Sequence, residues 1–502
     1  MGEADLKLSI PPKTSSLLAM VSSFLTEQDI KSYLVGGSVR DVLLGRDSAD
    51  IDIALAADAV EIAPKVADAL GGRFVLLDKV NRVARVVMVD EEAPAGGQWQ
   101  LDFSSFQGSI EQDLARRDFT IDAIAVDLGE LTRDYTHVHL IDPFHGWGDL
   151  QNGIIRAVSE TAFESDAARL LRAVRLAAEL GFSVDSQTEA LVRQNCHLIA
   201  DVAGERIREE LLRLLAVPDS ERFLPYLDEL GLLTAIIPEL AQAKGVEQPK
   251  EHSWDVFDHS LKTAIAVDSL LHEGTWKYAK DETLAIAPWS EVLSQHFAQE
   301  VSRGSTRRSL LKLAALLHDV AKPQTKAIGE DGRTHFLGHA NLGADIAVAI
   351  MERLRFSSKE IKLVEVMVRH HLRPGQMSQE GLPTHRAIYR YFRDSGEAGI
   401  DTLFLSLADH LATRGPNLDL AGWQEHAQLV EYVLAQHLEQ EKLAAPAKLV
   451  SGHDLIRIFS LSPGPEMGDL LEAVHEAQAS GEITTKEEAL AYIKERLATK
   501  AV

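Results

Sequence analysis

The segment YLVGGSVRDVLLGRDSADIDI, residues 33–53, decides the fold of the first part of this chain. It opens as a short apolar strand and runs into Gly36 and Gly37, where the lack of side chains lets backbone N–H groups approach a phosphate. A short helical stretch follows, and a second strand then carries Asp50 and Asp52. Because residues two apart in a strand share a face, both carboxylates point one way, with Cα atoms roughly 6.6 Å apart. The segment therefore predicts an α/β unit with a carboxylate pair on one face of its sheet.

The carboxylate pair predicts a site for divalent cations. Two carboxylates at this separation suit two Mg²⁺ ions about 3.5–4 Å apart, an arrangement that holds the attacking and leaving oxygens in phosphoryl transfer. Without a cation the two groups would repel each other and the pKa of one would rise. An Asp-x-Asp sequence alone is common at solvated strand ends. The specificity of the pattern lies in its position after the Gly-Gly turn and Arg40.

This arrangement resembles the nucleotidyltransferase head of the class II family that contains tRNA nucleotidyltransferases (CCA-adding enzymes) and poly(A) polymerases. A second stretch, EQDLARRDFTIDAIA at residues 111–125, resembles another motif of that family, R-R-D-F-T-x-N. The resemblance implies that Arg40 and Arg117 hold the triphosphate together with the Gly-Gly turn. Asp118 would accept a hydrogen bond from a ribose hydroxyl. The family usually has asparagine where this chain has Asp122, which leaves the role of that side chain open.

Asp102, in the strand-like sequence QLDF, is predicted to be a third catalytic carboxylate beside Asp50 and Asp52. The alternative is an ordinary aspartate on an edge strand. Only fifteen residues separate Asp102 from Asp118. CCA-adding members of the family carry a longer loop here, so the short segment resembles members that add only the two cytidines. The insertion at 91–97 is an alternative segment whose movement could change the shape of the nucleotide pocket.

The segment FESDAARLLRAVRLAAEL, residues 163–180, predicts one amphipathic helix that selects the base. Asp166 and Arg169 are three residues apart and would share a face, with Arg172 and Arg175 following at the same spacing. Such a pair is normally a surface salt bridge worth under ~1 kcal/mol. The family resemblance implies instead a protein template for the incoming base, with all four residues at the nucleotide.

The hydrogen-bonding groups of the bases make this interpretation specific. Cytosine and adenine each offer an amino donor beside a ring-nitrogen acceptor, which match Asp166 and Arg169. Uracil and guanine reverse the pattern, and each buried unpaired group costs about 1–3 kcal/mol. The pocket is therefore predicted to take CTP and ATP. The family motif opens with Glu-Asp, and Ser165 at the glutamate position predicts looser support for the pair.

A second group of histidines and aspartates resembles the metal ligands of the HD phosphohydrolase superfamily. Imidazole and carboxylate ligands suit ions such as Mn²⁺, Ni²⁺, Mg²⁺ or Fe. One His-Asp dipeptide occurs by chance, whereas the full set in order, with ALLHDVAKP intact, is specific. Lys322 after the dipeptide could hold a phosphate. The predicted ligands are His259, His318, Asp319 and Asp409, with His339 and the neighbours His370 and His371 as candidates for a second metal position, His370 being the predicted ligand.

The chain is predicted to be an α+β protein in which an α/β nucleotidyltransferase head precedes helical parts. Strand-like runs end near residue 140, and apolar residues at helical spacing follow. The predicted segments are an N-terminal leader (1–27), the head (28–140), a helical neck and body with the base-selecting helix (141–245), an HD domain (250–435) and a helical tail (446–502).

Composition narrows the class of protein. No apolar run approaches the ~18 residues of a membrane span, and Cys196 is the single cysteine, which excludes an intrachain disulfide. A net charge of −25 argues against indiscriminate binding of nucleic acid. A cytoplasmic enzyme with the tRNA 3′ end, CTP and ATP as partners is predicted, while its oligomeric state is left open.

Three other functions are alternatives to a tRNA nucleotidyltransferase. A poly(A) polymerase shares the head motifs, but the chain lacks a basic tail. A phosphohydrolase with a vestigial head and a non-catalytic RNA-binding protein are both opposed by the intact Asp50 and Asp52. We therefore expect an enzyme that adds C or A, or both, to tRNA without a nucleic-acid template and carries a second, phosphohydrolase site.

Overall fold

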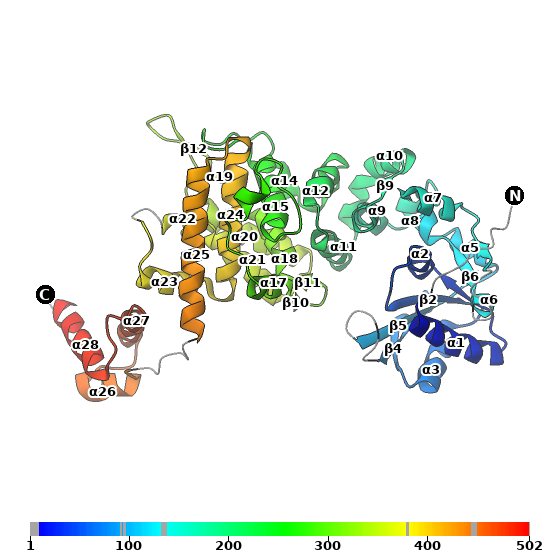
Figure 1. Cartoon of the computed structure of the whole chain (residues 1–502), viewed down its shortest axis with the longest axis horizontal. Coiled ribbons are helices and arrows are strands. Elements are labelled where there is room, and N and C mark those ends of the chain that lie inside the picture. Colours follow the sequence, from blue (N-terminus) through cyan, green and yellow to red (C-terminus); the bar gives the residue numbers. More distant parts are fainter. Residues whose placement is uncertain are drawn as a thin grey trace. The chain divides into compact units, whose positions relative to one another are not determined.

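The computed structural model of the chain describes residues 10–500 apart from 91–92, 94–96, 132–137, 378–380 and 443–448. Two compact units make up the chain (Figure 1). The first comprises Met1–Val202 with Leu230–Leu232, and the second comprises Ala203–Glu229 with Leu233–Val502. The predicted α+β fold is confirmed, because the first unit holds a large sheet and the second is mainly helical. These units are larger than the five predicted segments, whose boundaries stay a prediction.

A seven-stranded sheet forms the centre of the first unit among the residues described, in the order β3-β4-β5-β2-β1-β6-β7. Its strands are β1 (Ser32–Val35), β2 (Asp50–Leu55), β3 (Arg73–Asp78), β4 (Val83–Val89), β5 (Gln98–Ser105), β6 (Ala125–Asp127) and β7 (Leu140–Ile141). Neighbouring strands are antiparallel except β2 and β5, which run parallel. This parallel pair sets Asp52 directly beside Asp102.

The two faces of the sheet have different environments. Helices α1 (Pro12–Glu27) and α3 (Ala59–Leu70) contribute to a core that also takes in Ile51 and Ile53 of β2. The alternate residues of the same strand, Asp50 and Asp52, therefore point to the opposite face. Short helices α2 (Gly37–Leu43) and α5 (Ile110–Leu114) follow strands β1 and β5. The strand thus buries its isoleucines on one face of the sheet and presents its aspartates on the other.

The predicted helix over 163–180 is interrupted. Helix α8 (Ala162–Ser165) ends before Asp166, which is extended at φ −156° and ψ 102°, and α9 (Ala168–Leu180) begins two residues later. The Asp166 carboxylate accepts a hydrogen bond from the Ala168 N–H at 3.2 Å. Aspartate favours this capping geometry because its short side chain satisfies an N–H that the first turn of a helix leaves unpaired. The expectation of one continuous helix was wrong.

Long helices make up most of the second unit. Among the residues described, no helix combines the length and the apolar character needed to cross a membrane. Helix α15 is buried along nearly its whole length and packs against α18 and α24, so their side chains meet in the interior. The longer helices are α11 (Gly204–Ala216), α12 (Ser220–Glu229), α15 (Val256–Leu270), α18 (Arg307–Leu317), α20 (His339–Arg353), α21 (Ser358–His370), α23 (His385–Ser395), α24 (Gly399–Arg414), α25 (Leu420–Lys442), α27 (Pro465–Ala479) and α28 (Lys486–Lys500).

Candidate active sites

The carboxylates of β2 are fixed by the helix that follows the Gly-Gly turn. The Ser38 hydroxyl of α2 accepts from the Asp52 N–H at 2.7 Å and lies 3.2 Å from the Asp50 carbonyl oxygen, to which it donates. It also lies 3.4 Å from Asp52 Oδ2. One serine therefore joins the start of α2 to the strand that carries both carboxylates.

Three carboxylates gather at this end of the sheet. Asp102 on β5 is the in-register neighbour of Asp52, and adjacent strands lie about 4.8 Å apart. Burial raises the pKa of Asp52 to about 6; nearby Arg117 opposes the rise, while Asp102, Asp122 and Asp50 add to it. Crowded carboxylates with a raised pKa are the donor set that a divalent cation relieves. The predicted catalytic aspartates are therefore brought together.

The two glycines lie beneath two guanidinium groups. Gly36 has φ +66°, and a Cβ there would lie 2.5 Å from Arg117 Nη1 and 3.3 Å from Asp52 Oδ2. A Cβ on Gly37 would lie 3.4 Å from Arg40 Nη2. A side chain at Gly36 would displace the guanidinium of Arg117, and it would strain the backbone because φ is positive there. The structure thus places both predicted glycines and both predicted phosphate-binding arginines at one spot beside Asp52.

The arginines are held by aspartates on other elements. Arg40 donates to Asp122 at 2.8 Å and to Asp41 at 2.9 Å. Asp122 is buried, so the residue whose role the sequence left open is the partner that orients Arg40. Arg117 reaches Asp113 at 3.4 Å, and its buried Nε has no hydrogen-bond partner among the described residues. A phosphate oxygen is the kind of acceptor that this N–H lacks.

Arg169 is anchored mainly by backbone oxygens. It donates to the Arg116 carbonyl at 2.8 Å and to the Ala162 carbonyl at 3.2 Å. The Ser165 hydroxyl also accepts from Arg169 at 3.2 Å, so the serine that replaces the family's glutamate supports this arginine directly. Asp166 lies 4.0 Å from Arg169, a loose ion pair. The two predicted base-reading residues lie together, and each is held by its own contacts.

The remaining predicted nucleotide-binding residues form the border of the site. Arg172 donates to Asp118 at 2.9 Å, joining α9 to the Arg-Arg-Asp motif. Burial works against ionisation of Asp118, but Arg172 and Arg169 outweigh it, so its pKa lies below the ordinary value. Arg175 is buried and pairs with Glu179 at 2.5 Å, and Glu179 also acts on Arg40. Arg175 therefore pairs with a carboxylate whose charge acts on Arg40.

Substitution of Asp166 or Arg169 by alanine should relax base selection more than it weakens triphosphate binding. Each change removes one of two matched contacts, worth about 1–3 kcal/mol, so the preference for CTP over UTP should fall about fivefold or more. Single-turnover incorporation of each labelled nucleotide into tRNA measures this. Arg193→Ala, which removes an exposed arginine paired with Glu189 on α10, is the matched control. Unchanged selectivity in both variants would identify the pair as a surface salt bridge.

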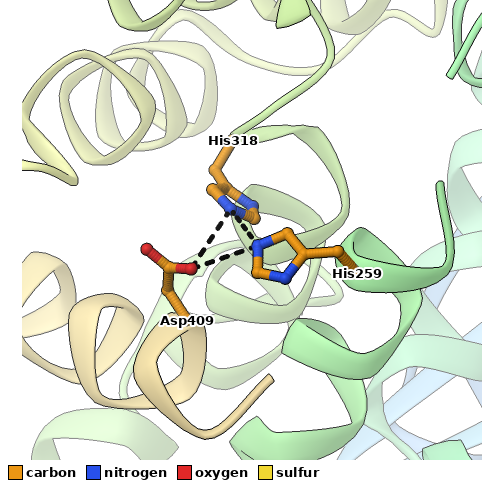
Figure 2. A group of neighbouring side chains, drawn as sticks. All are labelled: His259, His318 and Asp409. Carbon is orange, nitrogen blue, oxygen red and sulfur yellow. Dashed lines mark hydrogen bonds and ion pairs between the residues drawn. The ribbon is translucent and has the colours of Figure 1, made fainter. Parts of the chain in front are cut away.

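A second site lies in the helical unit, where His259 of α15, His318 after α18 and Asp409 of α24 point toward one another (Figure 2). His259 Nε2 lies 3.1 Å from Asp409 Oδ1 and 3.2 Å from His318 Nε2. The two histidines are completely buried. Two imidazoles and a carboxylate that converge within such distances form a donor set for a divalent metal ion.

Asp319 joins this group to a second one. Its Oδ2 lies 3.1 Å from His318 Nε2, and its Oδ1 lies 3.4 Å from His339 Nε2 and 3.9 Å from His371 Nε2. Asp319 is buried, and neither of its oxygens has a hydrogen-bond partner by distance and angle among the residues described, although both form ion pairs. A carboxylate with one oxygen toward each group is suited to bridge two metal ions.

His371 takes the position predicted for His370. Helix α21 ends at His370, and successive residues of a helix differ by about 100° in direction, so only one of two neighbours can face the cluster. His371 Nε2 lies 3.4 Å from His339 Nε2, whereas His370 lies near Arg373 and Asp394. Burial, with His318 adding to it, lowers the pKa of His371 to about 3, which keeps its ring neutral as a ligand must be. The geometry therefore favours His371 over the predicted His370 as a ligand of the second group.

Three of the histidines share one supporting contact. The Nδ1 atom of each lies within hydrogen-bonding distance of the carbonyl oxygen three residues earlier in the chain, which directs Nε2 to the centre. The pairs are His318 with Ala315 at 2.8 Å, His339 with Phe336 at 2.6 Å and His371 with Val368 at 2.7 Å. Such contacts fix the tautomer that a metal ligand needs.

Lys322 lies at the edge of the helical site. Its Nζ is 2.6 Å from Asp319 Oδ2 and 2.7 Å from Gln248 Oε1. The His252 ring lies 5.4 Å from that of His259. Sequence reasoning missed Gln248 and His252, because neither belongs to a motif and only the tertiary fold brings them to the cluster.

Comparisons with known proteins agree with this division into two sites. The chain matches the poly(A) polymerase head domain over residues 32–156 and a probable RNA- and SrmB-binding site of polymerase A over 181–244. It matches the HD domain over 256–414 and a putative domain 2 of tRNA nucleotidyltransferase over 416–493. The four matches follow the predicted order of head, helical neck, HD domain and tail.

Relatives match along nearly the whole chain. The A-adding tRNA nucleotidyltransferase of Deinococcus radiodurans is 35% identical over 470 residues, which cover 92% of this chain and 94% of that one. The CC-adding tRNA nucleotidyltransferase of Thermus thermophilus is 35% identical over 481 residues, 94% of each chain. The Thermotoga maritima CCA-adding enzyme complexed with tRNA has the same fold, with a TM-score of 0.61, 21% identity and coverage of 97% and 96%. The chain belongs to the tRNA nucleotidyltransferase family and carries an HD domain.

Proposed function

We propose that this protein transfers the cytidine monophosphate group of CTP to the 3′ end of tRNA without a nucleic-acid template, with release of pyrophosphate. The observation that carries the proposal is the grouping of Gly36 and Arg117 around Asp52, with Asp102 in the next strand. A triphosphate needs backbone and guanidinium donors beside a cation site, and these residues supply both. The names of the relatives support tRNA as the acceptor.

In the proposed reaction the tRNA 3′-oxygen bonds to the α-phosphorus of CTP while the bond from that phosphorus to the pyrophosphate oxygen breaks. Asp50, Asp52 and Asp102 are the carboxylates that would hold Mg²⁺, which would supply the positive charge to activate the hydroxyl and to neutralise the departing pyrophosphate. Arg40 and Arg117 bind and orient the triphosphate oxygens. Their fixed positions keep the α-phosphate in line with the attacking hydroxyl.

The sugar and base are held from the other side of the pocket. Asp118, fixed by Arg172, accepts from a ribose hydroxyl. Asp166 accepts from the amino group of the base, and Arg169 donates to its ring nitrogen. The backbone anchors of Arg169 make this donor rigid, which supports discrimination by position rather than by flexible fit.

The connection from β5 to α5 supports the addition of C rather than A. Strand β5 ends at Ser105 and α5 begins at Ile110. Phe106 is buried, its N–H donates to the Leu55 carbonyl at 3.0 Å, and Ser109 caps the helix. We infer that a connection this short and this firmly held keeps the shape of the pocket fixed. The insertion at 91–97 is the other segment that could reshape the pocket, and its residues 91–92 and 94–96 lie outside the described residues.

Incubation with CTP alone should therefore extend tRNA by two cytidines, and ATP should add little to a CC-ended tRNA. Adenine and cytosine hold their amino and ring-nitrogen groups at different distances from the ribose, so one rigid Asp166–Arg169 pair cannot match both without a hinge movement. The measurement uses tRNAs that lack all three, two or one of the terminal nucleotides, with a single labelled nucleotide in each reaction. Addition of ATP to the CC end at a rate similar to CTP addition would overturn the assignment.

Addition of the terminal A is the second candidate, favoured by the relative of that name from Deinococcus radiodurans. The same set of reactions distinguishes it, because an A-adding enzyme would use only ATP and only the CC end. A poly(A) polymerase would instead extend an unstructured RNA with many adenosines.

For the helical unit we propose hydrolysis of a phosphoester with Mn²⁺ or Ni²⁺ at the HD site. The buried histidines and the bridging geometry of Asp319 support a pair of metal ions. Lys322 would exchange its contact with Asp319 for a substrate phosphate. A cytoplasmic location fits a tRNA substrate, and it stays a prediction, as the oligomeric state stays open.

A further inference from the structure

Arg85 occupies an unassigned position in the row of residues that contains the catalytic carboxylates. It lies on β4, directly opposite Asp102 of β5, and Asp102 in turn lies beside Asp52 of β2. Residues in register on adjacent strands point to the same face, so the three side chains form one row across three strands. The alternate residues Ala84 and Val86 enter the core on the other face.

The contact between Arg85 and Asp102 uses both oxygens of the carboxylate. Arg85 Nε lies 2.6 Å from Asp102 Oδ1, and Nη2 lies 2.7 Å from Oδ2. Both side chains are about four-fifths buried, at 22% and 23% exposed, so solvent screens the pair less than at an open surface. A fork of two parallel N–H donors fixes the plane of a carboxylate as well as its position.

Arg85 also contacts Gln100, the residue of β5 that lies beside Asp50. Its Nη1 donates to Oε1 of Gln100, and Gln100 is the in-register neighbour of Asp50. The hydrogen bond with Asp102 is the largest cause that raises the pKa of Arg85, and the charges of Asp50 and Asp52 raise it further. One guanidinium therefore acts on all three carboxylates.

We infer that Arg85 is a positioning residue for nucleotidyl transfer, which holds Asp102 beside Asp52 and offsets one of the three negative charges gathered there. The inference rests on the proposed function of the head. Without Arg85, Asp102 would be free to turn away from its crowded neighbour Asp52. The arginine thus keeps the carboxylate row assembled before a cation binds.

The charge of Arg85 and its forked shape have separable effects. Arg85→Met removes both, so a cation meets a more negative site while Asp102 loses its orientation. We expect Mn²⁺ to bind the head at least about threefold more tightly and single-turnover addition of CTP to slow at least about tenfold. Arg85→Lys keeps the charge but offers a compact ammonium in place of the fork. It should restore the Mn²⁺ affinity and leave the addition slow.

The experiment uses the full chain, with Mn²⁺ titrated by calorimetry in the absence of nucleotide and tRNA. Asp52→Asn identifies which binding step belongs to the head, since the HD site also takes up metal. Arg82→Gln is the matched control, because Arg82 lies next to β4 and its side chain pairs with Asp58 at 3.3 Å instead. This control should match the wild type in both measurements.

A double-substitution cycle separates positioning from a general loss of structure. In the Asp102→Asn background, Arg85→Met should slow addition no further, because its effect acts through Asp102. Wild-type rates and Mn²⁺ affinity in Arg85→Met, or full activity in Asp102→Asn, would overturn the inference. Failure of the wild-type chain to add labelled CTP to tRNA would instead overturn the proposed function, so the two failures are distinguishable.

Discussion

Alanine in place of Asp50 or Asp52 should reduce nucleotide addition about a thousandfold or more, because the proposed cation site would lose a carboxylate and with it several kcal/mol of transition-state stabilisation. Asp52 is the more severe site, since it lies beside Asp102 and beneath Arg117. The measurement is single-turnover transfer of labelled CTP to tRNA that lacks its terminal nucleotides.

The control for this result is Asp47→Ala. Asp47 is an exposed aspartate that lies three residues before Asp50. This substitution changes the net charge equally and should retain wild-type rates. The metal content of the HD site should be unchanged in all three variants, because that site belongs to the other compact unit. Transfer retained within tenfold in either Asp50→Ala or Asp52→Ala would refute the assigned cation site.

His318→Ala or Asp319→Ala should remove metal from the helical unit and abolish its phosphoester hydrolysis while nucleotide addition continues. Each change deletes a buried ligand, and loss of Asp319 also removes the bridge between the two groups of histidines. Elemental analysis measures the metal, and bis(p-nitrophenyl) phosphate serves as a general phosphodiester probe. Metal content equal to that of the wild type in both variants would show the ligands to be wrong.

The neighbouring histidines give a sharper test of the same site. His371→Ala should lower the metal content by one of two ions, because His371 lies 3.4 Å from His339. His370→Ala should leave it unchanged, since that side chain lies near Arg373 and Asp394. The reverse outcome would restore the ligand set that the sequence predicted.

Local periodicity explains what the sequence could predict. The shared face of Asp50 and Asp52 follows from the two-residue repeat of a strand, and the Gly-Gly turn follows from residue type alone. The order of His259, His318, Asp319 and Asp409 likewise needs no knowledge of packing, and the structure brings all four together.

Pairing between distant segments explains what the sequence could not predict. The contact of Arg85 with Asp102 depends on the register of β4 against β5, and that of Arg40 with Asp122 joins two different motifs. The choice between adjacent histidines depends on the rotation of α21 against its neighbours. The chain breaks at Asp166 because this side chain caps the next helix instead of continuing the previous one. The spacing of residues alone does not distinguish these two outcomes.

The parallel pairing of β2 with β5 has a consequence for how the head folds. Asp52 and Asp102 are about fifty residues apart in sequence, and β3 and β4 intervene between their strands. Their pairing closes a long loop, a slow type of step because chain entropy is lost before the contacts form. The hairpin of β4 and β5 should form early and bring Arg85 and Asp102 to β2 as a preassembled pair. Cation binding by the head would then appear only with the last stage of folding, so a nascent or partly unfolded chain would not carry a working site.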